Sequence, residues 1–116
     1  MADGTVIVVT GECLGNVSPE DRQFGSEMLD KFLHVLEGYP ARPTGICFYT
    51  EGVKAVCEGS PHIMGLELLQ GLGVRIVACQ TCLNYYGLSE KIMVGDVVGM
   101  PQIVEMLMEA DNVITV

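Results

Sequence analysis

Two cysteines, Cys79 and Cys82, stand three positions apart at the point where an apolar run gives way to a helical pattern. Residues 74–79 predict a buried β-strand, and the residues that follow predict a short helix. Parallel sheets hold their reactive groups at the carboxyl ends of strands. There the free N–H groups and the dipole of a following helix stabilise a thiolate, the nucleophilic form of cysteine. Because Gln80 and Thr81 are small enough to leave the thiols accessible, we expect sulfur chemistry at this pair.

Four other residues could support the pair. Cys13 lies on a glycine-flanked loop after the first predicted strand and could approach Cys79 across the edge of the sheet. Lys54, one of six basic residues, follows the second predicted strand and could stabilise a thiolate. His62 follows a Ser-Pro helix start and could assist proton transfer, although a surface cap residue is the simpler interpretation. Thr81 stands between the two cysteines.

The composition narrows the class of protein. A chain of 116 residues is long enough to bury a core, so we expect residues 1–116 to form a single domain. Hydrophobic residues make up 49% of the chain, which argues against disorder. The net charge of −9 disfavours nucleic acid as a partner, because phosphate contacts need Lys and Arg.

The compartment can be inferred from the cysteines and from the start of the chain. No apolar run approaches the ~20 residues of a membrane helix, and the first residues lack the basic region of a signal peptide. We therefore expect a cytoplasmic protein with no membrane partner. The cysteine count of five is odd, which argues against a disulfide scaffold and favours thiols, metal ligands or catalytic groups. We expect no resident cofactor and no resident metal ion.

Strand and helix patterns alternate along the whole chain. Strands are predicted at residues 5–10, 44–50, 74–79, 92–98 and 112–116, and helices at 18–38, 60–72 and 101–110, with short helical turns at 53–57 and after residue 79. This alternation implies parallel pairing and right-handed crossovers. We predict an α/β fold, a three-layer α/β/α sandwich with a mostly parallel five-stranded sheet. Residues 10–15, 50–52 and 79–82 then meet at one edge of the sheet, where we expect the site.

Three stretches carry a resemblance to a known family: EGVKAVCEGSP at 51–61, GVRIVACQTCLNYYGL at 73–88 and VGDV at 94–97. They resemble the DsrE/DsrF-like proteins, and most closely the DsrE-like domain of the YedF proteins, which are described as sulfurtransferase-like and linked to selenium metabolism. The resemblance implies a flavodoxin-like fold and assembly into homotrimers or homohexamers. It also implies a persulfide on Cys79, which ends a strand as the carrier cysteine of the family does, with Cys82 assisting or resolving.

The resemblance also implies partners. YedF proteins usually carry a TusA-like sulfur-carrier domain in front, and these 116 residues hold none. We therefore expect sulfur or selenium donor and acceptor proteins, such as a TusA-like carrier, to come from other polypeptides.

Three alternatives to persulfide transfer stay open. A Cys-x-x-Cys motif in an α/β protein also suits dithiol redox chemistry, although the Trp and Pro of thioredoxin motifs are missing. Cys13, Cys79 and Cys82 could bind zinc or a cluster if a neighbouring subunit supplied a ligand. The pair could also be inert in a non-catalytic oligomeric binding module, since free cysteines are often simply buried.

Oligomerisation has some support from composition alone. The mean hydropathy is +0.39 and the chain has seven methionines, so one small domain would leave apolar surface exposed. Met100, Met106 and Met108 gather near the last predicted helix, which makes this helix a candidate interface.

Overall fold

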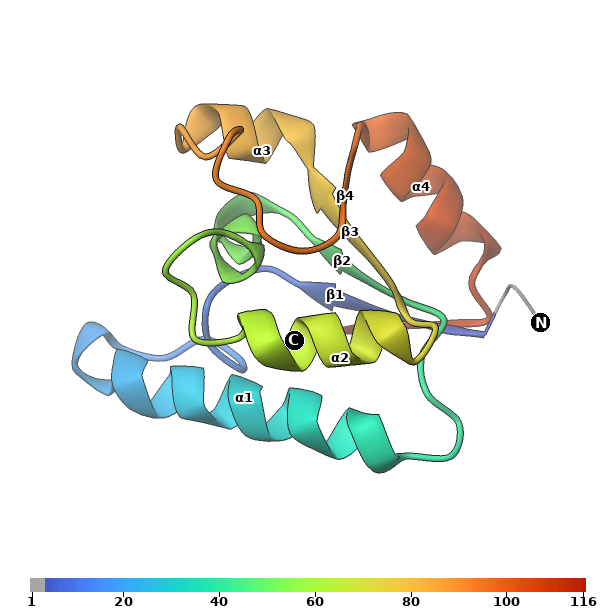
Figure 1. Cartoon of the computed structure of the whole chain (residues 1–116), viewed down its shortest axis with the longest axis horizontal. Coiled ribbons are helices and arrows are strands. Elements are labelled where there is room, and N and C mark those ends of the chain that lie inside the picture. Colours follow the sequence, from blue (N-terminus) through green and yellow to red (C-terminus); the bar gives the residue numbers. More distant parts are fainter. Residues whose placement is uncertain (1–3) are drawn as a thin grey trace.

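A five-stranded parallel sheet forms the centre of the protein in the computed structural model, which describes residues 4–116 (Figure 1). The strands are β1 (Thr5–Val9), β2 (Gly45–Phe48), β3 (Arg75–Cys79), β4 (Asp96–Val98) and β5 (Asn112–Thr115). The helices are α1 (Arg22–Gly38), α2 (Ile63–Gly71), α3 (Gln80–Tyr85) and α4 (Met100–Glu109), with 3₁₀ helices η1 (Pro19–Asp21) and η2 (Thr50–Val56). The predicted α/β fold with a five-stranded parallel sheet is confirmed.

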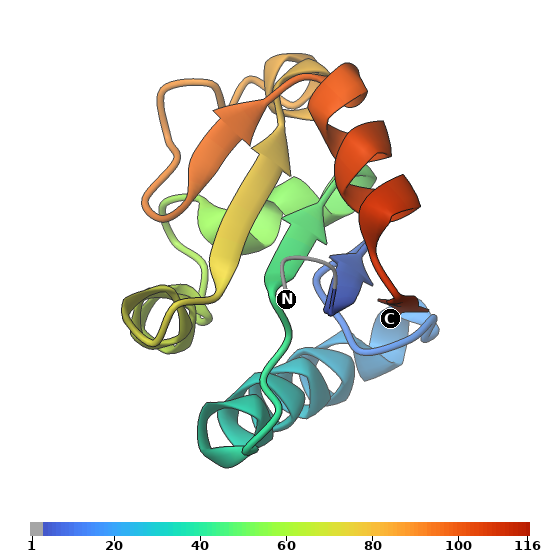
Figure 2. The same ribbon diagram turned by 90° about the vertical axis from the view of Figure 1, so that its right-hand side faces the viewer.

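The strand order across the sheet is β4-β3-β2-β1-β5, and every neighbouring pair is parallel. The chain therefore steps from β1 to β4 in one direction and then returns to place β5 beside β1. Right-handed crossovers in opposite directions put their helices on opposite faces. Figure 2 shows this arrangement, with α1 and α2 against one face and α4 against the other. Flavodoxin has the order 2-1-3-4-5, so the likeness to it lies in the architecture and not in the strand order.

The inner strands are buried on both faces, which explains why they read as continuous apolar runs. Every residue of β2 is buried, as are the last four residues of β1 and of β3. In contrast, all four residues of the edge strand β5 are exposed. The side chains of Phe48, Ile46 and Ile76 form the centre of the core, together with Leu29 and Leu66 from the helices.

Helix α4 covers its face of the sheet with few contacts. Ile103 is its only fully buried residue, and Met106 packs against the core where Gly45 leaves room for its Cε. Met100 and Met108 are exposed. Of the three methionines predicted at an interface, Met106 therefore belongs to the core of one chain.

Several predicted element boundaries differ from those of the structure. The strand expected at 92–98 is reduced to β4, because Ile92 forms an antiparallel bridge with Cys57 instead. Gly95 then turns the chain with φ +89, against the backbone of β3. The expected helix at 60–72 begins only at Ile63. The helical turn expected at 53–57 is present as part of the 3₁₀ helix η2.

None of the helices in residues 4–116 is both long enough and apolar enough to span a bilayer.

Candidate functional site

Cys79 is the last residue of β3 and the N-cap of α3. Its backbone is extended (φ −72°, ψ 122°), and helical geometry starts at the next residue. The side chain is only 1% exposed and is part of the hydrophobic core. The expectation that its polar neighbours leave Cys79 accessible is therefore wrong: Gln80 and Thr81 are exposed on α3, while Cys79 is buried.

Cys82 lies in the first turn of α3 and is half-buried, which makes it the most accessible of the five thiols. Its Sγ accepts a hydrogen bond from the backbone N–H of Thr50 at 3.1 Å. The Cys79 side chain also lies close enough to Cys82 to raise its pKa. The structure thus brings the two cysteines together, one in contact with solvent and one behind it.

A third thiol, that of Cys47, completes this sulfur-rich region. Cys47 is fully buried on β2, where it pairs in register with Val77 on β3. Burial, together with the smaller effects of the nearby Cys79 and Cys82, raises the pKa of Cys47 to about 11. Three sulfur atoms from β2, β3 and α3 therefore lie close together at the carboxyl end of the sheet.

The acidity of Cys82 differs from what the helix-terminus argument predicts. Burial raises the pKa of the Cys82 thiol, the Thr50 N–H lowers it by a smaller amount, and the proximity of Cys79 raises it again. The expected lowering of the thiol pKa by the helix terminus is therefore wrong for Cys82. A six-residue helix offers little dipole, and the desolvation of a half-buried thiol outweighs it.

The sequence places Thr50 at the carboxyl edge of the sheet but indicates no role for it in the site. It is the only non-glycine residue with positive φ among residues 4–116, at +48°. This backbone geometry is uncommon for a β-branched residue and strained. Its hydroxyl lies within donating distance of the carbonyls of Thr10 (3.1 Å) and Tyr49 (2.7 Å) and can share its one proton between them, which ties the end of β2 to the end of β1. The strained turn aims the N–H of Thr50 at Cys82.

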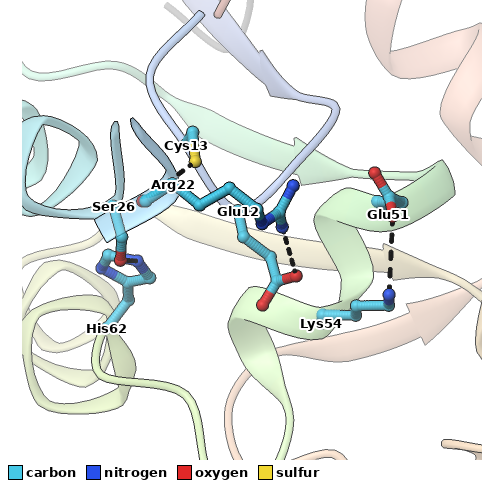
Figure 3. A network of polar contacts seen from close by, with 7 residues as sticks. All are labelled: Glu12, Cys13, Arg22, Ser26, Glu51, Lys54 and His62. Carbon is cyan, nitrogen blue, oxygen red and sulfur yellow. Dashed lines mark hydrogen bonds and ion pairs between the residues drawn. The ribbon is translucent and has the colours of Figure 1, made fainter. Parts of the chain in front are cut away.

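Lys54 stands on η2 near the pair, but its charge is used elsewhere. Its Nζ forms an ion pair with Glu51 at 3.5 Å (Figure 3). It also lies 4.6 Å from the ring centroid of Tyr86, the C-cap of α3. These contacts hold η2 against α3. They direct the ammonium towards a carboxylate and an aromatic face and not towards a thiol.

Cys13 does not join the other thiols. Its Sγ donates to the carbonyl of Arg22 at 3.5 Å, and it packs against Gly25 on α1, where any larger residue would collide with it (Figure 3). The prediction that Cys13 approaches Cys79 is therefore wrong. No group of three or more His, Cys, Asp or Glu side chains within residues 4–116 is arranged to hold a metal ion.

His62 is also placed differently from the surface cap residue favoured by the sequence. It is 1% exposed between α1 and α2, and its Nε2 lies 3.3 Å from the Ser26 hydroxyl (Figure 3). Burial lowers the pKa of His62, and the Asp30 carboxylate opposes that shift. Its contacts are with α1, so it has no part in the cysteine pair.

Two hollows open beside the carboxyl edge, and neither is lined by the cysteine pair. One, of about 430 Å³, lies between the loop after β1 and the end of β5. The other, of about 410 Å³, lies between η2, the start of α2 and Tyr86. Glu12 lines both, and its ion pair with Arg22 at 3.0 Å closes part of the first. The arrangement suits chemistry on the exposed side of α3 better than enclosure of a small substrate.

Comparison with known proteins identifies the family to which the chain is similar. The model of the DsrE/DsrF-like family matches residues 42–116, which is more than half of the chain. No curated protein matches the chain. The finer resemblance to the YedF branch stays a prediction, because the match is to the family as a whole.

Solved structures of similar fold cover nearly the whole chain. The chain is similar to the YchN protein from E. coli, with a TM-score of 0.68 and 19% identity over 98% of this chain and 99% of that one. It is also similar to the protein of unknown function MTH1491 from Methanobacterium thermoautotrophicum, with a TM-score of 0.69 and 20% identity over the same shares of the two chains. At these identities the likeness shows the fold alone.

Proposed function

Since the chain belongs to the DsrE/DsrF-like family, we propose that it carries or transfers sulfur as a persulfide on the Cys79–Cys82 pair. Family membership indicates a role related to sulfur relay. What supports persulfide transfer is the proximity of a half-buried thiol, Cys82, to a fully buried one, Cys79, at the carboxyl end of β3. A pair of this kind offers one sulfur to a partner and keeps the second within reach.

The order of the two thiols follows from their exposure. The family resemblance gives Cys79 the persulfide, but Cys79 is 1% exposed and a donor protein cannot reach it. Cys82 is in contact with solvent, so we assign it the first attack. Cys79 then acts from behind, as the thiol that receives or releases the sulfur.

The chemistry balances without an external cofactor. The Cys82 thiolate attacks the outer sulfur of a donor persulfide, the donor S–S bond breaks, and the donor leaves as a thiolate. An acceptor thiolate can then take the outer sulfur and restore Cys82. Alternatively, the Cys79 thiolate attacks Sγ of Cys82, which forms a Cys79–Cys82 disulfide and releases hydrosulfide. In that step the dithiol is oxidised by two electrons and the carried sulfur is reduced. Selenium can follow the same route.

The N–H of Thr50 has a defined part in this chemistry. A hydrogen bond to sulfur favours the charged form, and that of Thr50 opposes the pKa increase caused by burial. We expect it to stabilise the Cys82 thiolate when a donor has docked. The strained turn would then keep the N–H in position before the donor arrives.

The expected partners are donor and acceptor proteins, such as a TusA-like carrier, in a cytoplasm that keeps the thiols reduced. We also expect a homotrimer or homohexamer. In support, α4 and β5 expose several large apolar side chains, which include Val104, Met108, Val113 and Ile114. Light scattering of the purified protein measures this directly, and a monomer would contradict it.

Intact-mass spectrometry after incubation with a sulfane-sulfur donor tests the function. We expect the wild type to gain ~32 Da, the mass of one sulfur. The gain should vanish in Cys82→Ser, and in Cys79→Ser it should persist without release of sulfide. Cys13→Ser is the matched control, since Cys13 lies away from the pair. A loss of two hydrogens with neither a sulfur adduct nor released sulfide would instead indicate dithiol redox chemistry.

A second candidate is a non-catalytic oligomeric binding module. The burial of Cys79 and the raised pKa of Cys82 favour it, because both make the thiols less reactive at rest. A wild type that stays unmodified in the same experiment, with all five thiols intact, would support this function and overturn sulfur carriage.

A further inference from the structure

A polar group between α1 and α2 has no part in sulfur transfer, and His62 is its centre. The backbone N–H of His62 donates to Ser60 Oγ at 3.0 Å, which fixes the chain as it enters α2. The imidazole is 1% exposed, and Nε2 lies 3.3 Å from Ser26 Oγ (Figure 3). Nδ1 faces Asp30, with Oδ1 at 3.8 Å, and has no hydrogen-bond partner within residues 4–116. A buried ring nitrogen without a partner is costly and calls for a reason.

Helix α1 sets this geometry. Ser26 and Asp30 are four residues apart, so they lie one above the other on the same face of the helix. One contacts Nε2 and the other faces Nδ1, which places hydroxyl, imidazole and carboxylate in a line. In the tautomer that carries its proton on Nδ1, that proton faces the carboxylate and the lone pair of Nε2 is free to accept the Ser26 hydroxyl proton. Asp30 is 62% exposed and has room to close the remaining gap to Nδ1.

The surroundings of the His62 imidazole favour its neutral form. Burial lowers the pKa of His62, whereas the Asp30 and Glu12 carboxylates oppose that shift. Glu27 and Lys31 on α1 are the other charged groups at this place. A neutral imidazole at neutral pH is the form that a general base requires.

A hollow of about 470 Å³ opens directly beside this line of groups. Ser26, His62 and Asp30 all contribute to its wall, and Lys31 adds a positive charge. A small acyl compound can therefore approach the Ser26 hydroxyl from solvent. The hollow belongs to the α1–α2 face of the sheet, apart from the cysteine pair on β3 and α3.

We propose that Ser26 is a nucleophilic serine that accepts acyl groups from activated esters and thioesters, with His62 as its general base and Asp30 as a positioning residue. The Ser26 oxygen attacks the acyl carbon while its proton passes to Nε2 of His62. The bond between the acyl carbon and the leaving group breaks, and His62 returns the proton to the departing alkoxide or thiolate. The products are O-acyl Ser26 and an alcohol or thiol.

The site suits activated acyl groups and not amides. The backbone N–H groups around Ser26 are engaged in the hydrogen bonds of α1, so they cannot stabilise an oxyanion. Among the described residues that line the hollow, only Lys31 places a positive charge near the oxyanion that forms. Esters and thioesters with good leaving groups need the least help of this kind.

The test is acetylation by p-nitrophenyl acetate, followed by nitrophenolate release and by peptide-level mass spectrometry. We expect one acetyl group on Ser26 in the wild type and none there in Ser26→Ala. In His62→Gln the rate at Ser26 should fall by about 10²-fold or more, as expected for the loss of a general base. Ser18→Ala, which lies outside the hollow, is the control and should react like the wild type.

A pH profile separates a positioning role of Asp30 from a merely structural one. The acetylation rate should rise as His62 loses its proton and then level off. In Asp30→Asn the midpoint should move to lower pH, because the carboxylate that raises the pKa of His62 is gone. Asp30 is exposed, so this variant leaves the core intact. Acetylation confined to lysines and cysteines, or an unchanged rate at Ser26 in His62→Gln, would overturn the proposal.

Discussion

Alkylation of the native protein should modify Cys82 before the other four cysteines, at a rate that keeps rising into the alkaline range. Cys13, Cys47, Cys57 and Cys79 are at most 6% exposed, so a reagent reaches them only when the chain opens locally. Cys82 is half-buried and reacts from the folded state. Its pKa is raised, so its thiolate fraction at neutral pH lies below the ~3% of a free cysteine.

This thiolate fraction determines how steeply the alkylation rate at Cys82 rises with pH. Below its pKa, a thiol gains thiolate about tenfold for each pH unit. The alkylation rate at Cys82 should therefore rise about tenfold per pH unit from neutral pH. It should reach no plateau until the pH exceeds ~8.5, the pKa of free cysteine.

The assay is a time course of iodoacetamide labelling at several pH values, with peptide-level mass spectrometry to assign each adduct. Glutathione under the same conditions provides the reference rate for an exposed thiol. Cys82→Ser should remove the fast phase and leave only slow labelling of the buried thiols.

Two results would refute this reasoning. Labelling of Cys79 as fast as that of Cys82 would show that α3 does not shield β3. A plateau in the Cys82 rate below pH 8 would show that the Thr50 N–H lowers the pKa of Cys82 by more than burial raises it, whereas burial has the larger effect in the structure.

Three further predictions concern stability. Gly52→Ala should lower the free energy of unfolding by about 3 kcal/mol, because its Cβ would overlap the carbonyl oxygen of Val9 in the sheet, as urea denaturation will show. The wild type should lose stability as the pH falls below ~6.5, by up to about 1.4 kcal/mol per pH unit, because the pKa of His62 is lower in the folded chain than in the unfolded chain. In thermal unfolding recorded at several pH values below ~6.5, His62→Gln should lose this pH dependence. Thr50→Val should cost about 1 kcal/mol in the same denaturation assay, since it keeps the strained backbone but loses the hydroxyl hydrogen bonds.

Each of these has a control or a contrary result. Gly71→Ala meets no atom within 4 Å and should be neutral or stabilising, so equal losses at Gly52 and Gly71 would contradict the overlap. An acid slope that is the same in His62→Gln as in the wild type would assign it to other groups. If Thr50→Val matched the wild type, the two hydroxyl contacts would have no energetic role.

The fold could be predicted from the sequence to the extent that local patterns determine it. The β-branched run after Gly4 and the apolar run before Cys79 form strands because both faces of the sheet are covered. The strand order could not be predicted, since it depends on where the chain returns after α4. The segment 92–98 has the composition of a strand, but its first residues pair with Cys57 and only the last three reach β3.

The position of the cysteine pair at the end of a strand could be predicted from the sequence, but the solvent exposure of each thiol could not. The Cys-x-x-Cys spacing correctly indicates two neighbouring thiols at a strand end. Which thiol meets solvent depends on the direction in which α3 leaves β3, and this is a tertiary property. The burial of His62 has the same origin, because the approach of α1 to α2 covers a residue whose local sequence resembles a surface cap.

The most direct test of sulfur carriage is to locate the sulfur in the wild-type protein. The reduced protein would be treated with one equivalent of a sulfane-sulfur donor, trapped at once with an alkylating reagent, and mapped by peptide-level mass spectrometry. We expect an alkylated persulfide on Cys82 at the earliest times, followed by a Cys79–Cys82 disulfide and an equal amount of sulfide. A persulfide that appears first on Cys79, or no sulfur on either cysteine, would contradict this account.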